Sequence, residues 1–362
     1  MNLCYITALR YPSMQANRAQ VAKMSEALSC STQFKLVVSS WPQRREDIFD
    51  EYGIRSHFVV EELNVLPLFL WPRFMWYSFR IAWRLRKEPP RTIFYIRDIL
   101  LASALIIVSK RFRDRFFFEL HSLDRFPSVL YRIIFSRAQG VISTNTAKKK
   151  ALIDRWNIDE RKILVAPNGV DTELFSVELS KQEAKKSLDL PVDRRIVMYT
   201  GSAQYWKGLS LISESAKVLP EYLFVLVGAK IESSSNILII PRVPQREVPR
   251  YLRAADVLVA PYPPNHALSR MWASPLKIVE YMASGTPMIV SDLPIMQDFV
   301  DSTTALLVSP PSTAGFTNAI HWAFSHYADM EKRAGRARAH SKHFTWKKRA
   351  QSAIQFMQNR LI

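Results

Sequence analysis

The fold class follows from residues 196–219, which read IVMYTGSAQYWKGLSLISESAKVL. The apolar run at 196–200 predicts a β-strand that ends at Gly201, and the amphipathic run at 207–219 predicts a helix. The alternation continues along the chain, with further strands predicted at 224–227, 237–240, 257–260, 288–291 and 306–308. Strands that alternate with helices are typical of a doubly wound, mostly parallel sheet.

The N-terminal half of the chain shows the same alternation. Strands are predicted at 3–8, 34–39, 57–61, 92–96, 116–121, 141–143 and 163–166. We therefore expect an α/β protein with two Rossmann-like domains, at 1–172 and 173–345, that face each other across a cleft. A last helix within 346–362 is expected to pack back on the first domain, and the polar segment 176–195 is expected to connect the domains.

The charge balance is strongly basic. The 362 residues include 50 Lys and Arg against 32 Asp and Glu, for a net charge of +18, and residues 1–150 hold 24 basic and 12 acidic side chains. Such a field attracts nucleic acid, phosphorylated substrates or an acidic membrane surface. The nine glycines form neither G-x-G nor a P-loop, which excludes the two common phosphate-binding fingerprints.

The cysteines and the apolar runs bear on location. Two cysteines, Cys4 and Cys30, are too few for a disulfide framework or a zinc cage, and they fit a reducing cytosol. The start, MNLCYITALR, lacks the basic region of a signal peptide, and the longest uncharged runs are too short to span a bilayer. We expect a cytoplasmic protein, with peripheral docking on the cytoplasmic face of the membrane left open.

Two lysines predict an anion site in the second domain. Lys207 begins the helix after strand 196–200, and Lys277 falls in the first turn of another helix, for which Ser274 is a candidate N-cap and Pro275 the first residue. A cation at a helix N-terminus opposes the helix dipole unless an anion binds there. The alternative is that both lysines are solvated and that Lys277 pairs with Glu280.

Glu280 lies one turn further into the same helix. A carboxylate there can accept hydrogen bonds from the vicinal hydroxyls of a ribose, as in nucleotide-binding folds. Its alternative is an exposed helix residue.

Several motifs together resemble the family-4 glycosyltransferases of the GT-B fold (glycosyl transferases group 1). They are FELH at 118–121, GVISTN at 140–145, ILVAPNGVDTELF at 163–175, YTGSAQYWKG at 199–208, AADVLVAPY at 254–262, SPLKIVEYMASGTPMIVSD at 274–292 and FTWKKRA at 344–350. They stand in the order and spacing of the family and cover nearly the whole chain.

The resemblance implies a retaining, metal-independent transferase in cell-envelope, lipopolysaccharide or exopolysaccharide synthesis. Its donor would be a nucleotide-diphosphate sugar, with no further cofactor, and its acceptor a lipid-linked compound or a glycan. Domain 1–172 would hold the acceptor and domain 173–345 the donor. Lys207 and Lys277 would bind the donor diphosphate, Glu280 the ribose, and His121 would lie near the transferred sugar, so that His121 and the two lysines are the candidate catalytic residues. The remaining donor-site candidates are Gly201, Ser202, Arg242, Val243, Ser274 and Leu276.

Three positions depart from the family pattern. The first of two glutamates usually found eight residues apart is Trp272 here, and the arginine that commonly follows the glycine of the K-G loop is Ser202. The usual glycine-rich turn after the first strand reads ALRYPSMQANR. These departures bear on the donor contacts and leave an inactive homologue as an alternative.

Residues 66–87, LPLFLWPRFMWYSFRIAWRLRK, predict a helix that lies in a membrane interface. Basic residues gather near one side and aromatic residues line much of the rest; the candidates for the membrane or acceptor side are Arg73, Trp76, Arg80, Trp83 and Arg84. A second basic cluster follows at 110–115 and includes Arg111 and Arg113. The alternative is a buried domain helix whose arginines extend to solvent.

Two other functions compete with sugar transfer. One keeps the fold and changes the reaction, as in a GT-B sugar-nucleotide epimerase, although no clear set of acid and base carboxylates is present. The other is a basic nucleic-acid-binding protein, which the charge favours, although no nucleic-acid motif appears and we do not expect such a partner.

Overall fold

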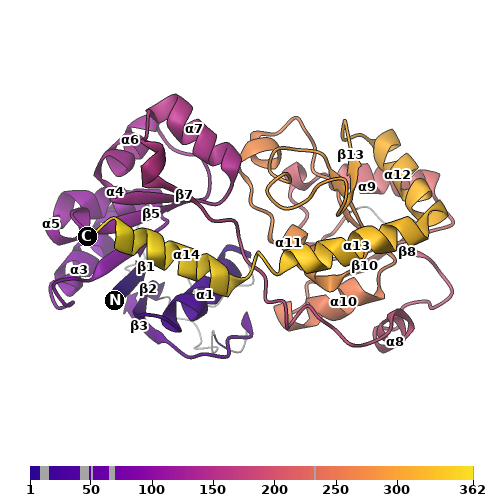
Figure 1. The fold of residues 1–362 in the computed structure, drawn as a ribbon, viewed down its shortest axis with the longest axis horizontal. Coiled ribbons are helices and arrows are strands. Elements are labelled where there is room, and N and C mark those ends of the chain that lie inside the picture. The colour runs from indigo at the N-terminus through magenta and orange to yellow at the C-terminus, as the bar shows by residue number, and fades with distance from the viewer. Residues whose placement is uncertain (9–15, 41–48, 50–51, 65–69, 232–233, 362) are drawn as a thin grey trace. The chain divides into compact units, whose positions relative to one another are not determined.

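The computed structural model describes residues 1–8, 16–40, 49, 52–64, 70–231 and 234–361. The described chain forms two compact units (Figure 1). Unit 1 contains residues 1–167 and 346–362, and unit 2 contains residues 168–345. The boundary between the units therefore lies five residues before the one expected from the sequence at 172.

Unit 1 is built on a seven-stranded sheet in which every pair of neighbouring strands is parallel. Its order is β3-β2-β1-β4-β5-β6-β7. The strands are β1 (Asn2–Ile6), β2 (Gln33–Ser40), β3 (Val59–Asn64), β4 (Ile93–Ile96), β5 (Phe116–Leu120), β6 (Gly140–Ser143) and β7 (Ile163–Val165). All seven were predicted, and the largest displacement is at β3, which begins two residues later and ends three residues later than expected.

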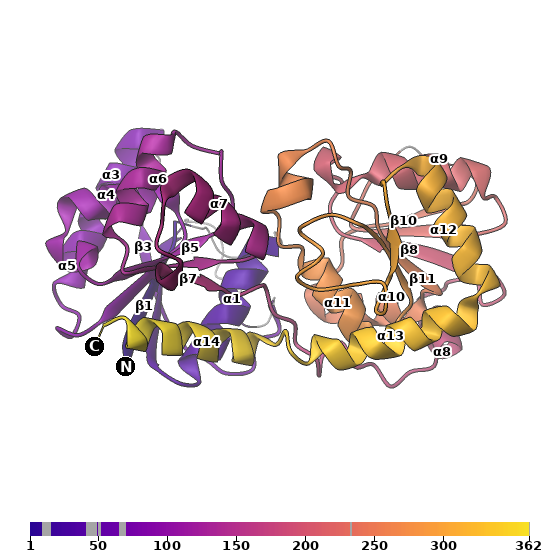
Figure 2. The same ribbon diagram turned by 45° about the horizontal axis from the view of Figure 1, so that its top comes forward.

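Helices cover both faces of this sheet. The N-terminal α1 (Ala16–Ser29) and the C-terminal α14 (Trp346–Asn359) pack together on one face, and α3 (Leu70–Leu85), α4 (Ile99–Val108) and α6 (Ser128–Arg137) lie on the other (Figure 2). The remaining described helices of unit 1 are α5 (Lys110–Arg113), α7 (Thr146–Trp156) and the 3₁₀ turn η1 (Glu160–Lys162). Because both faces are covered, β1, β4, β5 and β6 are mostly apolar, whereas β2 and β3, toward one edge, carry several polar and charged residues.

Unit 2 has a six-stranded parallel sheet of order β10-β9-β8-β11-β12-β13. Its strands are β8 (Ile196–Thr200), β9 (Leu223–Val227), β10 (Ile237–Ile240), β11 (Val257–Ala260), β12 (Met288–Ser291) and β13 (Leu306–Val308), which confirms the six predicted strands. Alternate residues of β8 enter two apolar cores, Val197 and Tyr199 on one face and Ile196 and Met198 on the other.

The helices of unit 2 follow these two cores. The pair α9 (Leu209–Val218) and α12 (Thr313–Ser325) covers one face. The other face is covered by α8 (Lys181–Ser187), α10 (Val248–Ala254), α11 (Leu276–Ser284) and α13 (Tyr327–Ser341). Short turns complete the unit: η2 (Tyr205–Lys207), η3 (Gln245–Glu247) and the π-helical η4 (Leu268–Trp272).

The strand orders place a topological switch point in each unit. In unit 1 the strands that follow β1 in sequence are added first on one side of it and then, from β4 onward, on the other. In unit 2 the same change of side occurs between β8 and β11. Ligands of doubly wound sheets bind beyond the carboxyl ends of the strands at such points. Gly201 and Ser202 follow β8 directly, so the loop to Lys207 starts at the switch point of unit 2.

The structure contradicts the expected connection between the units and the expected N-cap of α11. Residues 176–195 do not connect the units, because they lie inside unit 2 and carry α8, whose Ser180 and Glu183 form a reciprocal capping box. Ser274 is not the N-cap of α11, because Pro275 occupies that position in an extended conformation. The carbonyl of Ser274 instead accepts a hydrogen bond of 2.9 Å from Asn168 Nδ2, which holds the residue outside the helix.

Gly208 fixes the turn between η2 and α9. Its φ is +71°, and a Cβ built there would lie 1.6 Å from the Pro261 carbonyl oxygen at the end of β11. We predict that Gly208→Ala lowers the free energy of unfolding by more than about 2 kcal/mol, since strain and overlap add.

The control is Gly335→Ala in α13, where a Cβ would meet nothing within 4 Å. This variant is expected to gain roughly 0.5–1 kcal/mol from helix propensity. Chemical denaturation of both variants checks the pair, and a Gly208→Ala protein as stable as wild type would contradict the close approach.

Candidate functional site

Lys207 does not begin the helix after β8, as the sequence predicted, because it ends the η2 turn and α9 starts at Leu209, after Gly208. Its side chain points back toward the end of β8. Its Nζ donates a hydrogen bond of 2.7 Å to Ser202 Oγ and lies 5.3 Å from the ring centroid of Trp206. Burial and the nearby charge of Arg242 lower the pKa of Lys207 to about 8. Within the described residues, no carboxylate forms an ion pair with it, so its charge is not neutralised by the protein there.

Lys277 is the more deeply buried of the two lysines. Its residue is 7% exposed, and its Nζ lies 3.6 Å from the ring centroid of Tyr199 and 5.5 Å from that of Tyr262. A Cβ on Gly201 would come within 3.3 Å of this Nζ, so glycine leaves room for it. Burial and the charge of Lys207 hold the pKa of Lys277 well below its usual range.

The Lys277 ammonium has no hydrogen-bond partner among the residues that the structure describes. The alternative that this lysine is solvated and pairs with Glu280 is therefore wrong. The side chains of Lys207 and Lys277 thus converge with Gly201 and Ser202 beside the N-terminus of α11. Leu276 is the first residue of α11, and the first N–H groups of a helix lack partners within it.

Glu280 lies one turn further along α11 and is half-buried rather than exposed. Its Oε1 accepts a hydrogen bond of 2.6 Å from Gln245 Nε2, in the η3 turn. Burial raises the pKa of Glu280 to about 7, so a ligand that donates hydrogen bonds would favour the charged form. Arg242 and Val243 lie just before this turn, after the end of β10, and Val243 packs against the core.

Trp272 stands where the resemblance expects a glutamate. It ends the π-helical η4 and is 3% exposed, so an apolar ring fills this position. Ser202, the other departure, accepts the hydrogen bond from Lys207 instead of supplying a second cation. The replacement for the glycine-rich turn falls mostly on residues 9–15, which lie outside the described residues.

His121 directly follows β5 in unit 1. Its imidazole is 24% exposed, and its Nε2 lies 3.1 Å from Glu119 Oε1. Burial and the charge of Arg97 lower the pKa of His121 to about 3, so the ring is neutral near pH 7. A neutral imidazole can accept or donate one hydrogen bond without adding a charge.

The α3 helix exposes three aromatic side chains at positions i, i+3 and i+7. Trp76, Phe79 and Trp83 are 45%, 54% and 62% exposed, whereas Tyr77, Ile81 and Leu85 on the opposite side are buried, so α3 is a domain helix with one exposed aromatic face. Such spacing places the three exposed rings on one face of the helix. Lys87 Nζ lies 5.0 Å from the ring centroid of Trp83.

The arginines of the predicted membrane side have mixed environments. Arg84 is held by Glu61 at 2.5 Å and Glu88 at 3.3 Å, and Arg80 is partly exposed. Arg111 donates to the backbone carbonyls of residues 86, 88 and 89, and Arg113 to that of residue 106, so both also fix local structure. Arg73 lies in α3, but its side chain is outside the described residues.

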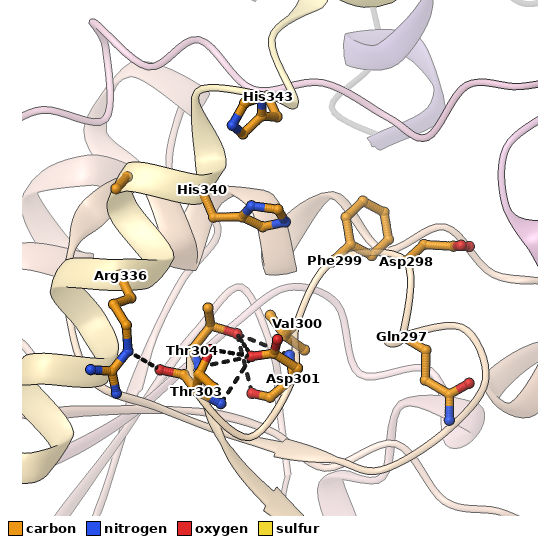
Figure 3. A pocket seen from close by; sticks show the side chains of 11 residues that line it. Gln297, Asp298, Phe299, Val300, Asp301, Thr303, Thr304, Arg336, His340 and His343 are labelled. Atoms are coloured by element: carbon orange, nitrogen blue, oxygen red, sulfur yellow. Dashed lines mark hydrogen bonds between the residues drawn. The ribbon is translucent and has the colours of Figure 1, made fainter.

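A cavity of about 430 Å³ in unit 2 contains none of the predicted site residues (Figure 3). It lies between the β12–β13 loop and α13, and its polar lining includes Asp301, Arg336 and His340. In the described ranges, no group of three His, Cys, Asp or Glu residues is placed to hold a metal ion. The described helices likewise include none that is both long and apolar enough to cross a bilayer.

Sequence reasoning missed four residues of these surroundings. Tyr199 and Tyr262 belong to the quoted motifs at 199–208 and 254–262, but nothing in those motifs predicts their contact with Lys277, and Gln245 carries no signal that links it to Glu280. Arg349 was quoted only within FTWKKRA, yet its guanidinium binds Glu119 beside His121. Each contact joins different segments of the chain, so no local sequence pattern predicts it.

Two regions of the chain match models of known families. The family described as "Glycosyltransferase Family 4" matches residues 33–174, and that described as "Glycosyl transferases group 1" matches residues 194–326. A relative from Xylanimonas cellulosilytica, D-inositol 3-phosphate glycosyltransferase, is 23% identical over 61% of this chain and 57% of its own length. The UDP-Gal:alpha-D-GlcNAc-diphosphoundecaprenol alpha-1,3-galactosyltransferase of Escherichia coli is 28% identical over 42% of each chain.

These matches span about half the length of the curated relatives, whereas solved structures match over the full length. Sucrose-phosphate synthase from Thermosynechococcus elongatus has a TM-score of 0.80 at 18% identity, covering 99% of both chains. HepE of Anabaena, solved in complex with UDP-glucose, has a TM-score of 0.77 at 16% identity, covering 99% of this chain and 100% of that one. From its two matched regions and its fold, the chain belongs to the family-4 glycosyltransferases, with the two Rossmann-like domains of the GT-B fold.

Proposed function

We propose that the protein is a retaining glycosyltransferase that moves a sugar from a nucleotide-diphosphate sugar to a lipid-linked or polysaccharide acceptor in cell-envelope synthesis. The observation that carries the proposal is the convergence of Lys207 and Lys277, without a described carboxylate partner, at the switch point of unit 2. The names of the relatives support the envelope role, and the UDP complexes of HepE support a nucleotide-sugar donor.

A diphosphate resolves the electrostatic conflict in this site. Its charge would stabilise both ammonium groups, and the free N–H groups of α11 would donate hydrogen bonds to its oxygens. Glu280 would accept from the ribose hydroxyls. The proposed site thus has groups suited to the diphosphate and to the ribose of a nucleoside diphosphate.

In the reaction we propose, the bond between the anomeric carbon and the diphosphate oxygen breaks while the acceptor oxygen bonds to the same face of that carbon. The acceptor proton passes to the leaving diphosphate. Negative charge grows on the diphosphate as it leaves, and Lys207 and Lys277 stabilise that charge. The neutral imidazole of His121 would contact the transferred sugar. No step requires a metal ion.

The acceptor side is proposed to dock on an anionic membrane through α3. Trp76, Phe79 and Trp83 supply exposed apolar surface, while Arg80 and Lys87 supply positive charge nearby. Aromatic and basic side chains on one helix are suited to the headgroup region of a bilayer. A lipid-linked acceptor would be met at such a surface.

Nucleoside diphosphates are expected to stabilise the protein through Lys207. A thermal-shift titration with UDP, GDP, ADP, TDP and CMP, without added metal, should show stabilisation by at least one diphosphate. At about 100 times its dissociation constant, a ligand adds roughly 2.7 kcal/mol. Lys207→Ala should abolish this gain, because the variant removes a cation beside the bound anion.

The matched control is Lys217→Ala. Lys217 lies at the far end of α9, which follows Lys207, and is exposed and paired with Glu214 at 2.7 Å. If Lys207→Ala and Lys217→Ala lost the same amount of stabilisation by the diphosphate, the effect would be one of overall charge and not of a specific site. Stabilisation by random oligonucleotides and by no diphosphate would favour the nucleic-acid alternative instead.

Lys277→Met is expected to separate stability from binding. A buried lysine with a lowered pKa costs stability below its unfolded pKa, and the cost falls as pH rises toward 10. The variant should therefore be more stable than wild type at pH 7, with the gain shrinking at higher pH. It should also lose stabilisation by the diphosphate. Urea denaturation at pH 7 and pH 9.5 checks this, and a destabilised variant would contradict it.

Membrane docking is expected to depend on the aromatic face of α3. The double variant Phe79→Ser/Trp83→Ser should lose most binding to vesicles with anionic lipid in a sedimentation assay. Its control, Val59→Ser/Val129→Ser, removes two side chains of unit 1 that are also more than half exposed but lie elsewhere. If wild type and the α3 variant bound the vesicles equally well, the proposed membrane docking through α3 would be contradicted.

A further inference from the structure

Glu119 is a fully buried carboxylate at the end of β5, two residues before His121. Its Oε2 accepts a hydrogen bond of 2.9 Å from the Tyr5 hydroxyl, and its Oε1 accepts one of 2.9 Å from Gln20 Nε2. The same Oε1 is approached by His121 Nε2 at 3.1 Å. This carboxylate of β5 therefore joins β1 and α1 to the imidazole.

Arg349 supplies the charge that Glu119 requires. It comes from α14, and its guanidinium lies 2.5 Å from Glu119 Oε1, with both side chains almost fully buried. Its Nε also donates to the carbonyls of Ala166 and Pro167, at 3.2 Å and 3.0 Å. Burial alone would raise the pKa of Glu119, but the charge of Arg349 contributes most to holding it well below its usual range.

Two other cations face His121 from neighbouring segments. Arg97 follows β4 and donates to Gln20 Oε1, so it adjoins the same network. Lys148 in α7 is buried and donates to the His121 carbonyl at 3.1 Å. His121 is thus held through its backbone by Lys148 and faced through its side chain by Glu119.

We propose that Arg349 is a positioning residue for His121 and acts through Glu119. The C-terminal helix then does more than cover the sheet of unit 1: it carries the group that fixes the charge and orientation of the carboxylate beside the imidazole. With Arg349 in place, the acceptor capacity of Glu119 is shared among Tyr5, Gln20 and the guanidinium. Without it, the buried carboxylate would draw a proton toward itself and His121.

The inference rests on the proposed function only for the role of His121 toward the sugar; the network itself is independent of it. Its test is therefore spectroscopic. In protein labelled at histidine with ¹⁵N and ¹³C, the His121 signal is identified by its loss in His121→Gln. The wild-type signal should remain that of a neutral ring between pH 5 and pH 8.

Arg349→Met should move the titration of His121 upward by about two pH units, so that protonation begins to appear near pH 5. An altered balance of the two neutral tautomers at pH 7 would support the proposal equally. The matched control is Arg360→Met, which removes another arginine of the C-terminal segment, bonded to the carbonyls of residues 139 and 161. It should leave the His121 signal unchanged.

Two further variants keep the test decisive if Arg349→Met does not fold. Arg349→Lys retains a cation and should give a smaller change of the same sign. In a Glu119→Gln background, Arg349→Met should add nothing to the His121 signal, since the two act in series. A folded Arg349 variant with a wild-type His121 spectrum would overturn the proposal, as would a change as large in Arg360→Met.

If transfer activity is measured, Arg349→Met should lower kcat while leaving the affinity for the diphosphate unchanged, because Lys207 and Lys277 are untouched. If the wild-type protein bound no diphosphate, the proposed function would be contradicted, but the histidine spectra would still test the role of Arg349. The two failures are therefore distinguishable.

Discussion

Both sheets are wholly parallel, and this determines at which edge of its sheet each unit can bind a ligand. Parallel strands end at one edge, so the residues that follow them gather there whatever their distance in the sequence. In unit 2 the edge collects Gly201 and Ser202 after β8, Tyr262 after β11 and the start of α11. In unit 1 it collects His121 after β5. The apolar strands supply the rigid support for these polar loops.

The buried charges at the two candidate sites are matched in different ways. In unit 1, Glu119 is matched by Arg349 and two neutral hydrogen-bond donors, so the charges are balanced within the protein. In unit 2, Lys277 is buried against the face of Tyr199 with no described hydrogen-bond partner. A balanced pair fixes structure, whereas an unbalanced cation lowers stability and gains most from a bound anion. We take this contrast as the main physical evidence for an anionic ligand in unit 2.

The sequence predicted the strands and the place of Lys277 in the first turn of α11, because both depend on local periodicity and on helix starts. It placed Lys207 at the start of a helix that in fact begins two residues later, at Leu209. The sequence did not predict side-chain contacts whose two partners lie far apart along the chain. The Tyr199 ring beside Lys277 could not be read from spacing, nor could the contact of Arg349 with Glu119, across more than two hundred residues. The capping box of α8 was readable in S-K-Q-E at 180–183 but was overlooked within a charged segment.

The central claim is that Lys207 and Lys277 form a site for the diphosphate of a nucleotide sugar. It is tested most directly by calorimetric titration of UDP at pH 8.5 in two buffers of different ionisation enthalpy, which measures the protons taken up on binding. Because both lysines have lowered pKa values and a bound anion would raise them, the account predicts net proton uptake. UDP binding without proton uptake, or with uptake unchanged in Lys277→Met, would contradict the account.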